Sequence, residues 1–263
     1  MGKAIKLIKN RSDIGAGTRG SDLGIDAIEI AAINNNSDYF NQFEFEDVKT
    51  HNDSIYDKNR SSFAKRIEHV VEQCTRVCDA VKENLEGNYF PIVLSGDHSS
   101  ALGTLSGVKA AYPEQNIGYK GPKVLAENLI YFGVRDTEEE EDKQIEKLHI
   151  KNYKVDEVRY RGLKTCIEEA LLKLTHCEVL YISFDVDAMD CDMISDGTGT
   201  PVPKGFDQYE IIAIINQIVK TKKVVCIEFV EVNPLLDTKG NKMAETAFEI
   251  LEAITSALIL PIK

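Results

Sequence analysis

The chain has 263 residues, of which 43% are hydrophobic and 28% are charged, and its formal net charge is -12. This length and balance are typical of one large globular domain, here residues 1–263, and argue against a low-complexity protein. The negative charge disfavours nucleic acid and anionic membrane surfaces as partners, and no apolar run reaches the ~20 residues that span a bilayer.

Strand and helix patterns alternate along most of the chain. Helices are expected over residues 64–85, 99–112, 138–148, 156–174, 207–219 and 243–258, and strands over 92–94, 129–134, 179–184 and 224–230. The strands are continuously apolar, which is typical of a parallel sheet covered by helices on both faces. We therefore predict an α/β fold with three layers, α/β/α, and a mainly parallel sheet.

The six cysteines form no C-x-x-C pair, and the first five residues contain no secretory apolar region. Reduced thiols are the default in a chain of this size without a signal peptide. We therefore expect a cytoplasmic protein with six unpaired, structural cysteines.

Polar side chains follow four of the predicted strands directly. In order along the chain they are His98, Arg135 with Asp136, Asp185 with Asp187, and Glu231. Ligands of an open parallel sheet bind outside the carboxyl ends of its strands. We therefore expect these side chains to form one site at one edge of the sheet.

Asp185 and Asp187 are the most informative pair, because two carboxylates at a strand end are costly unless a cation neutralises them. A divalent metal suits such oxygen ligands, and His98 is a further candidate ligand. The alternative is a surface turn with solvated acids. An EF-hand loop is excluded, since its sixth position would be Asp190 rather than Gly and its twelfth Asp196 rather than Glu.

Four motifs together resemble those of the arginase–agmatinase–formiminoglutamase family, the ureohydrolases, and of bacterial arginases in particular. The motifs are Ser95-Gly96-Asp97-His98-Ser99, Ser183-Phe184-Asp185-Val186-Asp187, Thr198-Gly199-Thr200-Pro201 and Glu231-Val232-Asn233-Pro234. The resemblance covers nearly the whole chain. It implies the three-layer arginase-like fold, hydrolysis of a guanidinium group to urea by two bridged Mn²⁺ ions, and a homo-oligomer, either a trimer or a hexamer.

The resemblance also implies roles for single residues. His98 would ligate one Mn²⁺ ion, Asp185 would bridge both ions, and Asp187 would ligate the second. The substrate side of the site would be formed by Glu231, Thr200, Asp136 and Glu138. Among these, Glu231 would face the guanidinium, since a carboxylate pairs with that planar cation through two hydrogen bonds.

The chain departs from the family pattern after the helix predicted over 99–112. The family has a strand ending in Asp-Ala-His-x-Asp there, followed by a loop with a histidine proton shuttle. Here residues 113–118 run directly into residues 119–122 and the strand at Leu129. Three of six expected ligands and the shuttle are absent, so a contiguous chain should bind one Mn²⁺ ion or none.

Three hypotheses follow. The first is an arginase-like ureohydrolase that acts on a small cationic guanidino substrate, converting L-arginine to ornithine and urea. The second is a non-catalytic family member with an incomplete metal site. The third is a deacetylase-type metal hydrolase on a related scaffold, against which Glu231-Val232-Asn233-Pro234 argues. The missing segment is either a true deletion or a part of the protein that the sequence lacks.

Overall fold

The computed structural model describes residues 3–57, 64–113 and 124–259. Its strands are β1 (Ala4–Asn10), β2 (Glu44–Asp47), β3 (Tyr89–Ser95), β4 (Ile130–Phe132), β5 (Lys151–Tyr153), β6 (Leu180–Asp185) and β7 (Val224–Val230). Its α-helices are α1 (Gly24–Asn34), α2 (Tyr39–Gln42), α3 (Ile67–Glu86), α4 (Ala101–Ala111), α5 (Glu139–Lys147), α6 (Val155–Arg161), α7 (Leu163–Lys173), α8 (Gln208–Val219) and α9 (Lys242–Ile259).

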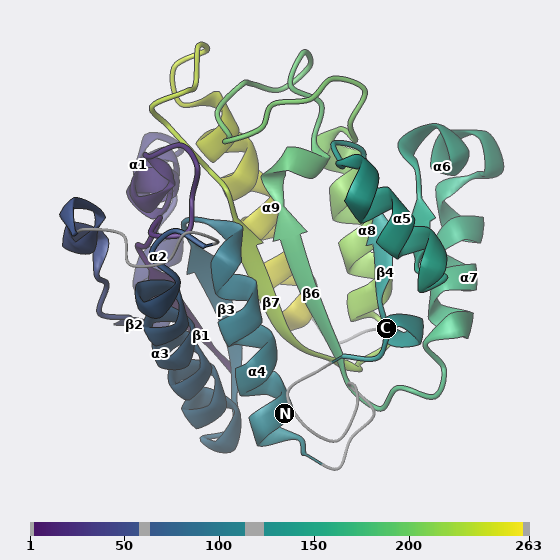
Figure 1. Ribbon diagram of the computed structural model, residues 1–263, viewed down its shortest axis with the longest axis horizontal. Coiled ribbons are helices and arrows are strands. Elements are labelled where there is room, and N and C mark those ends of the chain that lie inside the picture. The colour runs from purple at the N-terminus through teal and green to yellow at the C-terminus, as the bar shows by residue number, and fades with distance from the viewer. Residues whose placement is uncertain (1–2, 58–63, 114–123, 260–263) are drawn as a thin grey trace.

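Five strands form one parallel sheet in the order β2-β1-β3-β7-β6, and β4 and β5 form a second parallel pair. Figure 1 shows β4 to the right of β6, apart from the larger sheet. The parallel sheet that the sequence predicts is therefore confirmed, but in the described residues it is divided between β6 and β4.

Helices cover both faces of the larger sheet (Figure 1). Ile92 and Leu94 of β3 point into a core shared with α1, α8 and α9, whereas Val93 points into a second core shared with α3 and α4. This alternation follows from the two-residue period of a strand. The three-layer α/β/α fold is confirmed, and the carboxyl ends of β3, β6 and β7 meet at one edge.

The elements α1, α2, β1, β2 and β5 were not predicted, and two of the differences from the predicted elements have clear causes. The helix expected over 156–174 is divided into α6 and α7 at Gly162, whose φ of 91° only glycine adopts readily. The strand β1 was not predicted, because Lys6 and Lys9 interrupt its apolar pattern. Both lysines form ion pairs, Lys6 with Glu46 and Lys9 with Glu29, and Lys9 is buried.

The junction at which the family segment is missing lies largely outside the described residues, since it falls at 114–123. After α4 ends at Ala111, the described chain continues to Pro113 and resumes at residue 124, shortly before β4. Within the described parts, no helix is long and apolar enough to cross a membrane.

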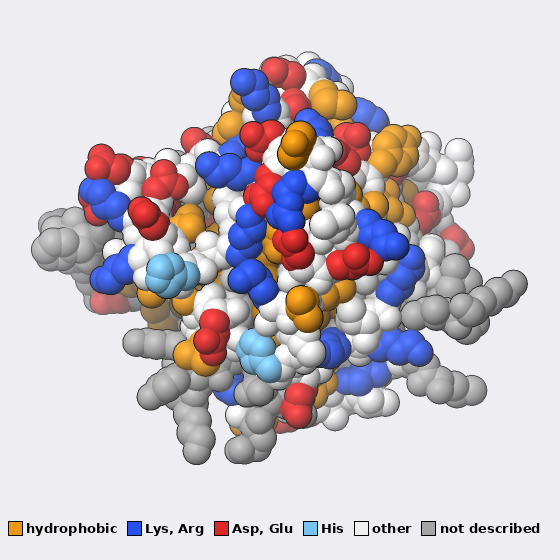
Figure 2. All heavy atoms as spheres, turned by 90° about the vertical axis from the view of Figure 1, so that its right-hand side faces the viewer, with side chains coloured by type: hydrophobic (Ala, Val, Ile, Leu, Met, Phe, Trp, Pro, Cys, Tyr) orange, Lys and Arg blue, Asp and Glu red, His pale blue; other side chains and the backbone are white. Residues whose placement is uncertain are grey.

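The face covered by α6 and α7 carries basic and acidic side chains interspersed (Figure 2). Lys151 and Arg161 both bind Glu157 at 2.8 Å, and Arg159 binds Glu210 at 2.7 Å. Because the two signs are paired, this face presents no continuous basic surface.

The Arg159–Glu210 pair gives a pH-dependent contribution to stability. Arg159 holds the pKa of Glu210 below its ordinary value of 4.5, so the folded state favours the ionised carboxylate. The contribution is present above about pH 4.5 and is lost as the pH falls through the lower folded pKa. We expect Glu210→Gln to lower the free energy of unfolding by about 1 kcal/mol at pH 7, measured by urea denaturation.

The difference between Glu210→Gln and the parent protein should disappear near pH 3. Glu168→Gln is a matched control, because Glu168 is exposed and pairs with Lys164 only at 3.7 Å. A Glu210→Gln effect that persisted at pH 3 would show that the ion pair is not its cause.

Candidate functional site

The turn after β3 presents His98 to the neighbouring strand. Gly96 lets the turn approach the loop after β1, because a Cβ there would lie 2.2 Å from the Ser12 carbonyl oxygen. Asp97 then caps the short 3-10 helix His98–Ser100 by accepting a hydrogen bond from the Ser99 amide at 2.9 Å. The Gly15 amide donates to the other Asp97 oxygen at 3.1 Å. Asp97 therefore fixes the turn both to the 3-10 helix and to the loop after β1.

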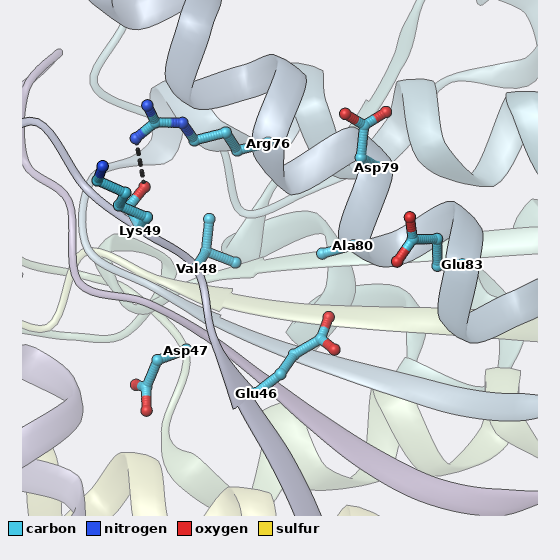
Figure 3. A pocket seen from close by; sticks show the side chains of 8 residues that line it. All are labelled: Glu46, Asp47, Val48, Lys49, Arg76, Asp79, Ala80 and Glu83. Carbon is cyan, nitrogen blue, oxygen red and sulfur yellow. Dashed lines mark hydrogen bonds between the residues drawn. The ribbon is translucent and has the colours of Figure 1, made fainter.

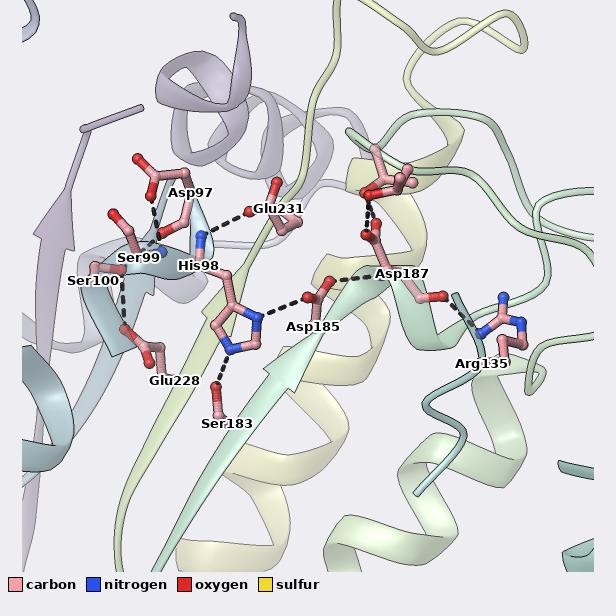
Figure 4. Close-up of polar contacts among 12 residues, drawn as sticks. Asp97, His98, Ser99, Ser100, Arg135, Ser183, Asp185, Asp187, Glu228 and Glu231 are labelled. Carbon is pink, nitrogen blue, oxygen red and sulfur yellow. Dashed lines mark hydrogen bonds and ion pairs between the residues drawn. The ribbon is translucent and has the colours of Figure 1, made fainter. Parts of the chain in front are cut away.

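Both ring nitrogens of His98 have partners on β6 (Figure 4). Nδ1 lies 2.8 Å from Asp185 Oδ2, and Nε2 lies 2.8 Å from Ser183 Oγ. Burial lowers the pKa of His98, but the hydrogen bond and charge of Asp185, with the charges of Glu228 and Glu231, outweigh it and raise the pKa to about 9. At neutral pH the ring is therefore a cation that donates to Asp185.

Asp187 is held by the loop that follows it. Its two carboxylate oxygens accept hydrogen bonds from the hydroxyls of Thr198 and Thr200, the latter at 2.9 Å. Its amide donates to Asp185 Oδ1 at 2.8 Å. Burial and the charge of Asp185 raise the pKa of Asp187 to about 6, although the two threonine hydroxyls act in the opposite direction. The two predicted acids thus lie side by side, as expected from their spacing.

Glu231 follows β7 and is bound to the same turn as His98. The Glu231 amide donates to the Gly96 carbonyl at 2.8 Å, and the His98 amide donates to Glu231 Oε1 at 2.7 Å. Its φ of 71° lies in the left-handed region, which is uncommon for a residue with a side chain. Backbone strain of this kind gathers at functional sites. Burial and the charge of Asp185 raise the pKa of Glu231 to about 8.

Glu228, in the middle of β7, supports the site from below and was not predicted. It is fully buried and accepts hydrogen bonds from Thr104 at 2.7 Å, Ser100 at 3.4 Å and the Tyr181 hydroxyl. Glu228 therefore ties the start of α4 to β6. Burial raises its pKa. The signal in the sequence is one acidic residue within an otherwise apolar strand, 224–230.

Within the described residues, two that were predicted to contact the substrate are not bonded to the cluster of His98 and Asp185. Asp136 and Glu138 are exposed, and Glu138 is the N-cap of α5. Among the described residues, no hydrogen bond or ion pair joins either to the His98–Asp185 cluster. Arg135 instead reaches that end of β6, donating to the backbone carbonyls of Asp187 at 2.9 Å and Met189 at 2.8 Å.

The site residues in this arrangement do not fit two bridged Mn²⁺ ions. Among residues 3–57, 64–113 and 124–259, no three His, Cys, Asp or Glu side chains converge so that they could hold a metal ion. A protonated His98 offers no lone pair, and each oxygen of Asp187 already accepts a hydrogen bond from a threonine hydroxyl. A metal ion would have to displace these hydrogen bonds and a proton before it could bind.

A surface groove of about 370 Å³ lies elsewhere, beside β2 and α3 (Figure 3). Its lining residues are Glu46, Asp47, Val48, Lys49, Arg76, Asp79, Ala80 and Glu83. None of the predicted site residues contributes to it, and its carboxylates gain partners such as Lys6 and Arg11. The groove is therefore separate from the cluster after β3, β6 and β7.

Comparisons with known proteins agree with this architecture. A family model described as "Arginase family" matches residues 4–119 and 117–256. Arginase of Bacillus subtilis (strain 168) is 30% identical, with 99% of this chain and 100% of the relative covered, and arginase of Bacillus caldovelox is 27% identical, with 96% and 98% covered. The crystal structure of arginase from Bacillus subtilis superimposes with a TM-score of 0.80 at 26% identity, covering 99% and 100% of the two chains.

The same comparisons bear on the missing segment. The family match consists of two parts that meet at residues 117–119, between α4 and β4. The alignment with the Bacillus subtilis relative spans 302 positions, whereas this chain has 263 residues. At least 39 of those positions therefore have no counterpart in this chain. The division of the family match at residues 117–119 agrees with the place at which the motifs predict a missing family segment.

Proposed function

This chain belongs to the arginase family, and we propose that it binds a small guanidino compound, with L-arginine as the first candidate. The observation that carries the proposal is Glu231, a carboxylate fixed at the carboxyl edge of the sheet by the His98 amide. Burial and the charges of Asp185 and Asp187 raise the pKa of Glu231. A planar cation would relieve this concentration of negative charge and would donate two parallel hydrogen bonds to the Glu231 carboxylate.

We further propose that a contiguous chain of 263 residues does not hydrolyse the bound compound. Binding alone does not accelerate a reaction unless the transition state is bound more tightly than the ground state. His98, Asp185 and Asp187 are half of the ligand set that the family resemblance implies, and all three side chains are hydrogen-bonded to protein groups.

The alternative is a manganese-dependent ureohydrolase that converts L-arginine to ornithine and urea. The names of the relatives, which are arginases, favour it. It requires the missing ligands to come from a segment that the sequence lacks. The deacetylase hypothesis has no such support, since the matched family is that of arginase.

Calorimetric titration with L-arginine tests the binding proposal. Glu231→Gln should weaken binding by about 10-fold or more, because a lost hydrogen bond to a charged group costs about 1.5–3 kcal/mol. L-ornithine, which lacks the guanidinium, should bind more weakly than L-arginine to the parent protein. Glu139→Gln is the control, since the Glu139 side chain is 84% exposed on α5. Equal affinity of the Glu231→Gln and parent proteins for L-arginine would refute the proposal.

The remaining properties are proposals that rest on the family alone. Residues 1–263 would act as one domain, and the protein would be a cytoplasmic homo-oligomer, either a trimer or a hexamer. Asp136, Glu138 and Thr200 would contact the end of the substrate that carries the amino-acid group or wall the site beside it.

A further inference from the structure

The guanidinium of Arg135 has a backbone carbonyl for each of its five N–H donors. The side chain follows β4 and is partly buried. Its acceptors are the carbonyl oxygens of Pro203 at 3.1 Å, Gly133 at 3.3 Å, Asp187 at 2.9 Å, Met189 at 2.8 Å and Val202. An arginine at the carboxyl edge of a sheet is suited to bind an anionic ligand. Here all five donors are already used within the protein, so Arg135 has another role.

Four of these carbonyls lie on one loop between β6 and α8. Residues 187–191 form its outgoing limb and residues 202–206 its return limb, and Arg135 binds two carbonyls on each limb. The limbs are also paired directly, since the Phe206 amide donates to the Ala188 carbonyl at 3.0 Å. Arg135 therefore closes the base of this loop.

The tip of the same loop carries the two threonines that hold Asp187. Thr198 and Thr200 donate their hydroxyls to the two Asp187 carboxylate oxygens. Asp187 is thus bound through its carbonyl by Arg135 and through its carboxylate by the tip of the loop (Figure 4). Because the tip is connected to the base by both limbs, a change in their separation would move the threonines away from the carboxylate.

We propose that Arg135 is a positioning residue of the candidate site. It keeps the two limbs at a fixed separation, so that Thr198 and Thr200 meet the Asp187 carboxylate. The effect of Arg135 on L-arginine affinity rests on the proposed function, whereas its effect on Asp187 does not. Arginine suits this role because its donors form a rigid planar fork, whereas lysine has three donors on a flexible stem. Arg135→Lys therefore keeps the charge but leaves at least two of the five carbonyls without this donor.

The ¹³C NMR signal of the Asp187 carboxyl carbon tests the proposal in the full chain. It is recorded at about pH 8, above the pKa of about 6 of Asp187, and is assigned with Asp187→Asn. Thr200→Val removes one hydroxyl donor and should shift the signal, and Arg135→Lys should shift it in the same direction. The double variant should shift the signal by less than the sum of the single shifts, because both changes act on the same hydrogen bonds.

Arg159→Lys is the matched control. Arg159 donates to the Gly205 carbonyl on the return limb at 2.9 Å and pairs with Glu210, so its replacement loosens the same limb without removing a bond to Asp187. The Asp187 signal should stay unchanged in this variant. Equal signals in the two lysine variants would show that Arg135 serves stability alone. Additive shifts in the double variant would also overturn the proposal.

Arg135→Gln, whose planar amide keeps two donors, takes the place of Arg135→Lys if the lysine variant does not fold, and the same shift is expected. Calorimetric titration then tests the consequence for binding. Arg135→Lys should weaken L-arginine binding by about 10-fold, whereas Arg159→Lys should leave it unchanged. Equal affinity of Arg135→Lys and a parent protein that binds L-arginine would refute a role in ligand binding. A parent protein that binds no L-arginine would refute the proposed function, and the Asp187 signal would still decide the role of Arg135.

Discussion

Gly96→Ala should lower the free energy of unfolding by about 3 kcal/mol, at the upper end of the range for an overpacked interior. The added Cβ would lie 2.2 Å from the Ser12 carbonyl oxygen and 3.1 Å from the Ser21 carbonyl oxygen. Both contacts are with backbone atoms, which cannot move aside as a flexible side chain can. The same turn also binds Glu231 through the Gly96 carbonyl. Urea denaturation of the two proteins measures the difference.

Gly17→Ala is the matched control for this experiment. Gly17 lies in the nearby glycine-containing loop, and a Cβ there would meet no atom within 4 Å. Its stability should stay within about 0.5 kcal/mol of the parent protein. Equal stability of the Gly96→Ala and Gly17→Ala proteins would contradict the close packing of the Gly96 turn against the Ser12 backbone.

The second large effect is expected at Glu228. Glu228→Ala should cost about 3 kcal/mol, because it leaves a cavity and removes the acceptor of three buried hydroxyls. Glu228→Gln keeps one acceptor oxygen and nearly the same volume, so it should cost only about 1 kcal/mol. Thermal unfolding monitored by circular dichroism gives both values. Equal losses in the two variants would show that volume and hydroxyl acceptance are not what Glu228 supplies.

Much of the fold could be predicted because the relevant signals are local. The strand predicted over 224–230 is β7, and Asp207 caps α8 as its position suggests, accepting from the Glu210 amide at 2.8 Å. The first strand escaped prediction because its lysines are neutralised by acids distant in sequence, such as Glu46. Local patterns do not reveal such pairs. The division at Gly162 depends on one backbone angle that the flanking helical pattern conceals.

The site was predictable in part for the same reason. The rule that parallel strands end at a common edge brings His98, Asp185 and Asp187 together, and the structure shows the His98–Asp185 hydrogen bond at 2.8 Å. The roles of Glu228 and the strained backbone of Glu231 depend on contacts across three elements, so strand patterns could not show them.

Urea release is the most direct test of the central claim that this chain binds a guanidino compound without hydrolysing it. The assay uses L-arginine and added Mn²⁺, on protein whose intact mass has been shown to equal the 29.4 kDa of this sequence. The account predicts no urea above the level of a protein-free control. Mn²⁺-dependent urea release from protein of that mass, lost in Asp185→Ala, would contradict it.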